Sequence, residues 1–157
     1  MNTGWRTLNS CSAAETEGIG RMLAQRLTVP ATVALHGDLG CGKTVLARGI
    51  ARGLGVAEPI TSPTFAIAQE YACPQGIWLY HLDLYRIDDE EQALAFGIDE
   101  YLFAADAVCV LEWPERIPHL LGVPAVQQAG RLVRIEIEHV GPQQRRLRLP
   151  ADLADGT

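Results

Sequence analysis

Lysine is almost absent from this 157-residue chain, in which Lys43 is the single example among 13 lysine and arginine residues. The class of GTPases that reads guanine through an Asn-Lys-x-Asp motif is therefore excluded, because no second lysine exists to build it. Where arginine supplies nearly every cation, a retained lysine indicates a position that needs a compact ammonium and has no room for a planar guanidinium. We therefore expect Lys43 to lie in a narrow anion-binding site.

The chain also lacks an excess of basic charge. Its formal net charge is −6 and its pI is about 5.1, so the surface as a whole does not attract a polyanion. Arg145, Arg146 and Arg148 form a local cluster that can still meet a phosphate or the acidic face of a partner. Autonomous binding to nucleic acid is nevertheless disfavoured.

Paired cysteines and long apolar segments are missing as well. The four cysteines are at least 30 residues apart and form no C-x-x-C pair, which argues for reduced thiols and against a zinc or redox centre. No apolar run reaches the length of a membrane span, and residues 1–8 carry no signal-peptide pattern. We expect a cytoplasmic protein without membrane contact.

In other respects the composition is that of one ordinary globular domain. A mass of 17.1 kDa is enough for one buried core and too small for two. Apolar residues make up 48% and charged residues 20%, both typical of globular proteins, and no repeat or linker is evident. We predict a single domain over residues 1–157, with residues 151–157 as a disordered tail.

The strongest motif in the chain is a complete G-x-x-x-x-G-K-[ST] phosphate-binding loop. It consists of Gly37, Asp38, Leu39, Gly40, Cys41, Gly42, Lys43 and Thr44. A buried strand over residues 32–36 is predicted before it, and a helix over residues 45–54, beginning at Val45, after it. Backbone amides and the helix N-terminus would then face the phosphates of ATP, and the hydroxyl of Thr44 would face Mg²⁺. The alternative is an ordinary glycine-rich turn before a helix.

Cys41 occupies a variable position of this loop, next to Lys43 and a helix N-terminus. Such surroundings lower the pKa of a thiol, and we expect the thiol to be accessible. Two interpretations remain open, a passive small residue and a redox switch, and the passive one is favoured because no second cysteine is close in sequence.

Turnover of a bound nucleotide needs a carboxylate near Mg²⁺ and a group that orients water, and two acids at strand ends are candidates. Glu112 follows the continuous apolar run over residues 107–111, and Asp83 follows the strand predicted over residues 77–82. Alternatively, either acid caps a strand or pairs with Arg86 or Arg116 on the surface.

Three hydroxyl residues follow the loop and its helix, and nucleotide switches carry a γ-phosphate sensor at this place in the chain. They are Thr61, Ser62 and Thr64, although Ser62 with the following proline can be a simple turn. Trp113 is either a wall of the site or ordinary core. The four histidines, His36, His81, His119 and His139, have no metal-ligand spacing, and we interpret them as structural or surface residues.

The predicted elements form an α/β fold, a single P-loop NTPase-like domain. Its sheet is mixed, with a parallel core and antiparallel hairpins, and helices cover both faces. The first predicted helix begins at the capping box of residues 12–15 and ends before residue 30, and the second covers 45–54. A third begins at Asp88, with Glu91 in its first turn, and ends near residue 97. Two short helices are predicted over 99–103 and 114–121. Strands are predicted over 32–36, 65–71, 77–83, 107–111, 132–139 and 145–149.

Four motifs in this order resemble the bacterial tRNA threonylcarbamoyladenosine biosynthesis ATPase family (the E component). They are the loop at 37–44, Thr-Ser-Pro-Thr-Phe at 61–65, His-Leu-Asp-Leu-Tyr-Arg at 81–86 and Glu-Trp-Pro-Glu at 112–115. The resemblance extends from about Ser12 to the final hairpin. Cys41 stands where alanine is usual, and Val45 stands where a second hydroxyl residue is common.

The resemblance implies a small enzyme that hydrolyses ATP to ADP. Its partners would be the threonylcarbamoyl-transferase subunit and the inactive paralogue of that subunit, and it would support modification of the adenosine next to the anticodon in tRNAs reading ANN codons. Contact with tRNA would be indirect, through the complex.

The resemblance also implies roles for single residues. Thr44 and Glu112 would hold Mg²⁺, and Asp83 would be needed for turnover. Ser12 to Thr16 and Arg145 would border the nucleotide.

Two alternatives from other functional classes remain open. A small-molecule kinase of the P-loop class would need an acceptor pocket and an arginine-bearing lid. A nucleotide-dependent adaptor with little turnover would bind its partners more tightly with ATP even when hydrolysis is abolished.

Overall fold

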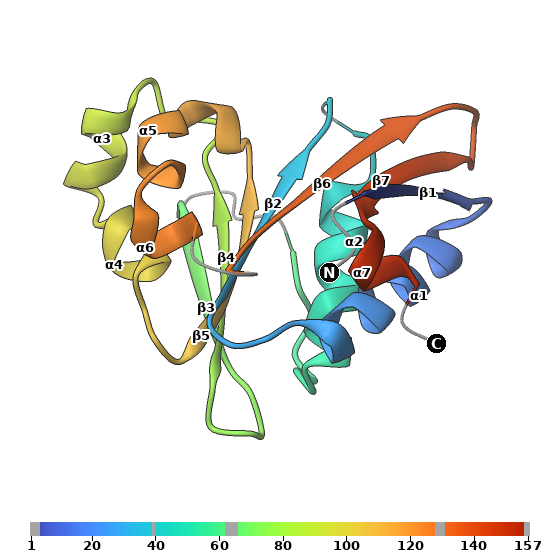
Figure 1. The fold of residues 1–157 in the computed structure, drawn as a ribbon, viewed down its shortest axis with the longest axis horizontal. Coiled ribbons are helices and arrows are strands. Elements are labelled where there is room, and N and C mark those ends of the chain that lie inside the picture. The colour runs from blue at the N-terminus through green and yellow to red at the C-terminus, as the bar shows by residue number, and fades with distance from the viewer. Residues whose placement is uncertain (1–3, 39, 62–65, 128–130, 156–157) are drawn as a thin grey trace.

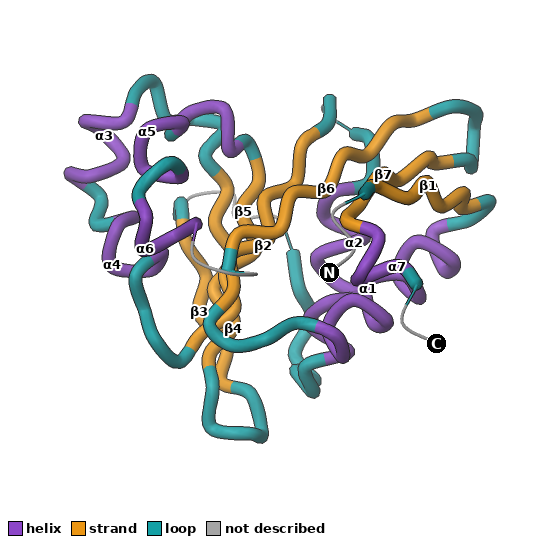
Figure 2. The backbone as a smooth tube through the Cα atoms, viewed as in Figure 1, coloured by secondary structure: helices purple, strands orange, loops and turns teal. Residues whose placement is uncertain are grey.

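The computed structural model of the protein describes residues 4–38, 40–61, 66–127 and 131–155. Its centre is a seven-stranded mixed sheet with the strand order β1-β7-β6-β2-β5-β4-β3. The strands are β1 (Trp5–Ser10), β2 (Ala31–His36), β3 (Ala68–Ala72), β4 (Trp78–Asp83), β5 (Ala107–Glu112), β6 (Leu132–His139) and β7 (Arg145–Pro150). Helices lie on both sides of this sheet (Figures 1 and 2). The predicted α/β class is confirmed.

The middle of the sheet is parallel and its edges are antiparallel. Strand β2 lies between β5 and β6 and runs parallel to both, and β4 runs parallel to β5. Strand β3 closes one edge as a hairpin with β4, while β7 and β1 close the other edge. The carboxyl ends of the parallel strands therefore meet at one edge, where ligands bind in open α/β sheets.

One face of the sheet is covered by α1 (Ala13–Arg26), α2 (Lys43–Gly53) and α7 (Ala151–Ala154). Val108 and Val110 of β5 point into this core, together with Leu46 and Ile50 of α2. Helices α1 and α2 touch through glycine, since a Cβ at Gly49 would lie 2.1 Å from a backbone oxygen of α1. We call this side the α2 face.

The other face is covered by shorter helices, α3 (Glu90–Ala95), α4 (Ile98–Leu102), α5 (Pro118–Leu121) and α6 (Pro124–Gln127), with the 3₁₀ turn η1 (Pro114–Arg116). Leu82 and Leu111 point from the sheet into this second core. Polar side chains join the short helices, because Glu90 accepts hydrogen bonds from the backbone amides of His119 (3.1 Å) and Leu120 (2.9 Å). We call this side the α3–α6 face.

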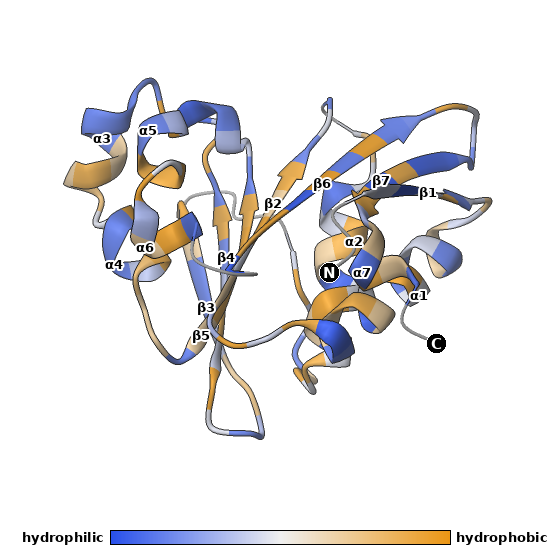
Figure 3. Ribbon diagram, viewed as in Figure 1, coloured by the Kyte–Doolittle hydropathy of each residue, from blue (hydrophilic) through white to orange (hydrophobic). Residues whose placement is uncertain are grey.

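Charge is distributed unevenly between these regions. The stretch Ile87–Glu115, which includes α3 and α4, holds nine of the 19 acidic residues and none of the 13 lysine and arginine residues. Figure 3 shows hydrophobic residues along the central strands and hydrophilic ones along β7 and on parts of α3 and α4. Among the described helices, none combines the length and apolar character needed to cross a bilayer.

Several predicted elements are confirmed within a residue or two, namely β2, α2, β4, β5, β6 and β7. The hairpin of β3 with β4 is also confirmed, but β3 begins at Ala68, three residues later than predicted. Ser12 caps α1 by accepting from the amide of Glu15, as the capping box predicted. The cap of α3 was placed one residue too early, because Asp89 accepts from the amide of Gln92. The 114–121 helix is divided by Ile117 into η1 and α5.

Three features differ from the sequence prediction. Strand β1 and helix α6 were not predicted. The tail from residue 151 was expected to be disordered, but it forms α7, in which Ala151 is fully buried and Leu153 nearly so. This end of the chain is ordered because α7 packs into the core of the α2 face, and residues 156–157 lie outside the described part.

Candidate active site

The phosphate-binding loop joins the end of β2 to the start of α2, as predicted. Gly40 and Gly42 have positive φ angles of 79° and 109°, and Gly42 is the N-cap of α2. A Cβ at Gly37 would lie 2.6 Å from the backbone oxygen of Ile137 in β6, so this position has no room for a side chain. Leu39 lies outside the described residues. The loop backbone thus depends on glycine for both its turns and its close approach to the sheet.

Lys43 is buried, with 4% of its surface exposed. Its Nζ donates to the backbone oxygen of Gly37 at 2.7 Å and lies 3.8 Å from the centre of the Trp113 ring. The distance to the ring is that of a cation–π contact. A guanidinium would not fit this narrow place between a carbonyl and an indole, which agrees with the retention of a single lysine.

Trp113 connects the loop to the strand β5. Its φ of 63° places a bulky residue in the left-handed region, which costs about 1–2 kcal/mol. The ring also packs against Tyr85, with the two ring centres 5.1 Å apart. Trp113 combines the two alternatives, because it lines the cavity beside the loop and also packs against the core of the α3–α6 face.

That cavity has a volume of about 1050 Å³ and adjoins the phosphate-binding loop. Its lining includes Gly40, Gly42, Lys43, Thr44, Val45, Asp83, Glu112, Trp113 and Arg145, together with apolar residues of β3 and α4. Most of the described residues predicted for the site are therefore brought together around one hollow.

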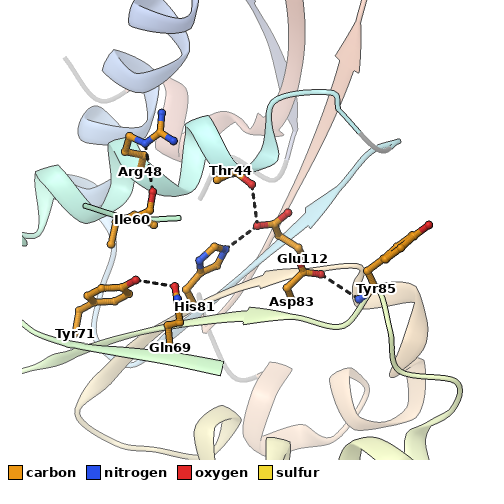
Figure 4. Close-up of polar contacts among 9 residues, drawn as sticks. All are labelled: Thr44, Arg48, Ile60, Gln69, Tyr71, His81, Asp83, Tyr85 and Glu112. Carbon is orange, nitrogen blue, oxygen red and sulfur yellow. Dashed lines mark hydrogen bonds and ion pairs between the residues drawn. The ribbon is translucent and has the colours of Figure 1, made fainter. Parts of the chain in front are cut away.

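Glu112 and Asp83 face each other at the carboxyl ends of the parallel strands, where β4 and β5 pair them in register. The carboxylate of Glu112 is buried, and its Oε2 accepts a hydrogen bond from the hydroxyl of Thr44 at 3.4 Å. Asp83 Oδ1 accepts from the backbone amide of Tyr85 at 3.0 Å. Figure 4 shows Thr44 reaching Glu112 from the first turn of α2. Arg116 donates to the backbone oxygen of Tyr85 at 3.4 Å.

The electrostatics of this edge favour the neutral form of Asp83. Burial raises the pKa of its carboxyl above the ordinary value, and the neighbouring Glu112 charge adds to this effect. The Tyr85 amide, His81 and Lys43 oppose it in part. A carboxyl with a raised pKa is better suited to accept a proton at neutral pH than an ordinary aspartate.

His81 contacts the site carboxylate Glu112, which the sequence patterns did not indicate. It was interpreted as structural or surface, yet its Nε2 lies 2.6 Å from Glu112 Oε2, with both side chains buried. A signal was present, because residues two apart on a strand share a face and His81 stands two before Asp83. Metal-ligand spacing along the chain does not indicate a histidine that contacts a carboxylate on another strand.

Arg145 lies beside the loop, whereas Ser12 and Thr16 belong to the start of α1. A Cβ at Gly42 would be 3.1 Å from Nε of Arg145, and β1–β7 pairing sets Arg145 opposite Ser10. The Thr16 hydroxyl lies 2.6 Å from that of Ser10, and Ser12 caps α1. Among the described residues, the cavity lining includes neither Ser12 nor Thr16.

The hydroxyl segment after α2 is described only in part. Thr61 is exposed and is not among the described residues that line the cavity. Ser62 and Thr64 lie outside the described residues, so the predicted γ-phosphate sensor stays a prediction.

The expectation of an acidic, accessible Cys41 is wrong. Its side chain is 2% exposed, because it turns inwards against Gly37. Burial raises the pKa of the thiol, and the nearby Lys43 ammonium offsets only part of this increase. The passive interpretation therefore agrees with the structure better than the redox switch.

The oxygen atoms at this edge have the chemistry that Mg²⁺ prefers, a hydroxyl and a carboxylate. Thr44 and Glu112 supply them within hydrogen-bonding distance of each other. In the part of the chain that the structure describes, no three His, Cys, Asp or Glu side chains converge as a metal site. The donor set thus fits a cation held jointly by the protein, phosphate oxygens and water, which is usual for Mg²⁺.

Comparisons with known proteins agree with the architecture and the motifs. Residues 10–147 match the family model for the threonylcarbamoyl adenosine biosynthesis protein TsaE. The tRNA threonylcarbamoyladenosine biosynthesis protein TsaE of Bacillus subtilis is 37% identical over 148 residues, which are 94% of this chain and 84% of that protein. The protein of the same name from Synechocystis is 43% identical over 109 residues, 67% of this chain and 68% of its own length. The crystal structure of Bacillus subtilis YdiB superposes with a TM-score of 0.68 at 29% identity, covering 98% of this chain and 93% of that one.

Proposed function

The chain belongs to the TsaE family of tRNA threonylcarbamoyladenosine biosynthesis proteins, and on this premise we propose that it is a Mg²⁺-dependent enzyme that hydrolyses ATP to ADP. The observation that carries the proposal is the meeting of Lys43, Thr44, Asp83 and Glu112 around one cavity. A phosphate-binding loop alone would bind nucleotide, whereas two carboxylates beside it add what hydrolysis requires.

The loop and Lys43 bind the phosphates in this proposal. The amides of residues 37–44 and the N-terminus of α2 offer donors and a positive dipole end to an anion. The Lys43 ammonium, already held inside the loop by Gly37, adds a compact charge. Cys41 and Val45 would contribute through their backbone, and the contact predicted for Leu39 stays a prediction.

Thr44 and Glu112 would hold Mg²⁺, which supplies positive charge against the negative charge that develops on the phosphate oxygens. Asp83 stands next to Glu112 on the neighbouring strand, and its raised pKa suits it to orient a water molecule and accept its proton. Trp113 and Arg145 would border the nucleotide from the side of the cavity. Ser12 and Thr16 are retained as predicted nucleotide contacts, and Thr61 and Thr64 as the predicted γ-phosphate sensor.

The partners proposed are the threonylcarbamoyl-transferase subunit and its inactive paralogue, with tRNA reached only through them. The acidic composition supports indirect contact with tRNA, because a net charge of −6 disfavours direct binding.

Calorimetry with adenine nucleotides tests the metal assignment directly. In the unmodified protein, Mg²⁺ should tighten ATP binding; Glu112→Ala should lose most of that tightening and keep metal-free binding. Asp152→Asn, an exposed acid on α7, serves as a matched control that should behave like the unmodified protein. Equal Mg²⁺ dependence in Glu112→Ala would contradict the role given to Glu112.

Turnover is tested separately with Asp83→Asn. This variant should bind ATP and its partners, release no ADP, and leave tRNA unmodified in a reconstituted reaction. If Asp83→Asn still supported modification, the protein would act as a nucleotide-dependent adaptor and the proposed enzymatic role would be wrong.

A further inference from the structure

His81 lies on strand β4, between β5 and the edge strand β3, with 1% of its surface exposed. It shares a strand face with Leu79, which packs into the core of the α2 face, and with Asp83 at the strand end. Its Nε2 is 2.6 Å from Oε2 of Glu112. Figure 4 shows the imidazole reaching the carboxylate from the side opposite Thr44.

The second ring nitrogen of His81, Nδ1, makes no hydrogen bond within the described part of the chain that would explain a histidine at this buried position. Nδ1 is buried and has no hydrogen-bond partner among the described residues. Gln69, which pairs with His81 across the β3–β4 hairpin, instead accepts a hydrogen bond from the hydroxyl of Tyr71 at 2.7 Å. Burying an unpaired polar atom costs roughly 1–3 kcal/mol, so an apolar residue would be the better choice if His81 only filled the core.

The contact with Glu112 identifies the tautomer. A carboxylate only accepts, so the proton of the imidazole is assigned to Nε2. The unpaired Nδ1 then carries a lone pair, whereas the other tautomer would bury an N–H without an acceptor. His81 is therefore arranged as a hydrogen-bond donor to Glu112.

The same oxygen of Glu112 receives both contacts, from His81 at 2.6 Å and from Thr44 at 3.4 Å. The shorter bond comes from β4, the strand that pairs with β5 and sets Asp83 opposite Glu112. The longer one joins it to the first turn of α2, next to the phosphate-binding loop.

From this geometry we propose that His81 is a positioning residue, whose Nε2–H holds the Glu112 carboxylate in the orientation that receives Mg²⁺ together with the nucleotide. This inference rests on the proposed function, since it concerns how well the metal is bound at that site. Partners of this kind behind metal ligands typically change metal affinity about 10- to 100-fold.

Three variants separate positioning from packing. His81→Gln places an amide N–H near the position of Nε2, His81→Asn is polar but too short to reach Glu112, and His81→Leu fills the space without a donor. The Mg²⁺ concentration that half-saturates the ADP complex, followed by calorimetry, should rise by about 10- to 100-fold for His81→Asn and His81→Leu. His81→Gln should restore most of the affinity, while metal-free ADP binding stays equal in all variants.

The outcomes distinguish this inference from the proposed function. If the unmodified protein bound ADP without any Mg²⁺ dependence, the proposed function would fail. If it showed the dependence and His81→Asn matched it, the positioning role would be overturned. A loss of metal-free ADP binding that parallels a lower melting temperature in all three variants, with no rescue by His81→Gln, would also overturn it and identify His81 as a packing residue.

Discussion

The two faces of the sheet are built by different means. On the α2 face, α1 and α2 have 14 and 11 residues and touch backbone to backbone at glycine. On the α3–α6 face, four helices of four to six residues pack over a second apolar core, and the Glu90 side chain joins α3 to α5. The site chemistry lies on the α2 face, since Thr44, His81 and Glu112 meet there. The comparison indicates that close packing supports the residues whose geometry matters most.

The largest effect is expected where that close packing is broken. In Gly49→Ala the new methyl group would lie 2.1 Å from the backbone oxygen of Glu17, so the helices must separate. We expect a loss of about 2–3 kcal/mol in the free energy of unfolding, after the gain in helix propensity is counted. Urea unfolding followed by circular dichroism measures it.

Gly97→Ala, on the α3–α6 face, is the matched comparison. No atom lies within 4 Å of its added Cβ, and only the positive φ of 77° is unfavourable. The cost should be about 1 kcal/mol. If Gly97→Ala proved as damaging as Gly49→Ala, the proposed difference between the faces would be wrong.

The hydrogen bonds by which Glu90 joins α3 to α5 on the α3–α6 face are tested by Glu90→Gln. Burial raises the pKa of this carboxyl, but the bonds from the Leu120 amide and from His119 outweigh burial and lower the pKa overall. Because ionised Glu90 is more favourable in the folded than in the unfolded protein, it adds to the free energy of unfolding at pH values above its ordinary pKa. This stabilisation is lost as the pH falls through the lowered pKa of the folded protein.

At pH 7 we expect Glu90→Gln to lose about 1 kcal/mol. The difference from the unmodified protein should shrink below about pH 4, because both then lack the charge. Thermal melting from pH 3 to 8 measures this, with the exposed neighbour Glu91→Gln as the control. A loss independent of pH would show that the charge is not responsible.

For Asp83, at the carboxyl ends of the parallel strands, removing the charge is expected to increase stability, whereas for Glu90 it is expected to decrease it. Burial and the Glu112 charge raise the pKa of Asp83, so ionised Asp83 costs stability once the pH exceeds the ordinary value. Asp83→Asn should therefore raise the melting temperature modestly, by less than about 4 °C at pH 7. The gain should vanish near pH 3, and Asp88→Asn, an exposed acid, should show none.

The smallest effect concerns thiol labelling, which probes each face without changing stability. Cys11 is exposed, whereas Cys41, Cys73 and Cys109 are buried. Burial raises the pKa of Cys109, whose thiol donates to the backbone oxygen of Tyr101 in α4, to about 12. Native protein at pH 8 should take up one iodoacetamide by mass spectrometry, and Cys11→Ser should take up none. Rapid labelling of Cys109 alone would show that the α3–α6 face opens independently.

The sequence was sufficient for the parts of the fold that local patterns determine. The phosphate-binding loop is one continuous motif, and Glu112 follows a strand whose residues are all buried. Helix α2 and the strands next to it could therefore be predicted from apolar periodicity and glycine positions, whereas α7 on the same face was not. The same holds for the meeting of Thr44 with Glu112, because a strand end and a helix start adjoin at this edge.

The missing parts depend on partners that are distant in sequence. Strand β1 has five residues that are not fully buried, and its pairing with β7 comes from the other end of the chain. Cys41 looked accessible because its burial depends on the turn of the loop against β6. His81 required knowledge of which strand lies next to β4. These are tertiary effects, which single-residue patterns do not contain.

The run of acids without a base, Ile87–Glu115, gives the molecule an electrical polarity. The remaining chain holds all 13 cationic residues and ten acids, so it is slightly positive, while α3 and α4 are strongly negative. An approaching polyanion is repelled from one side more than from the other, and it turns the molecule before any contact forms. The orientation of encounter is thus selected at long range, and salt weakens that selection.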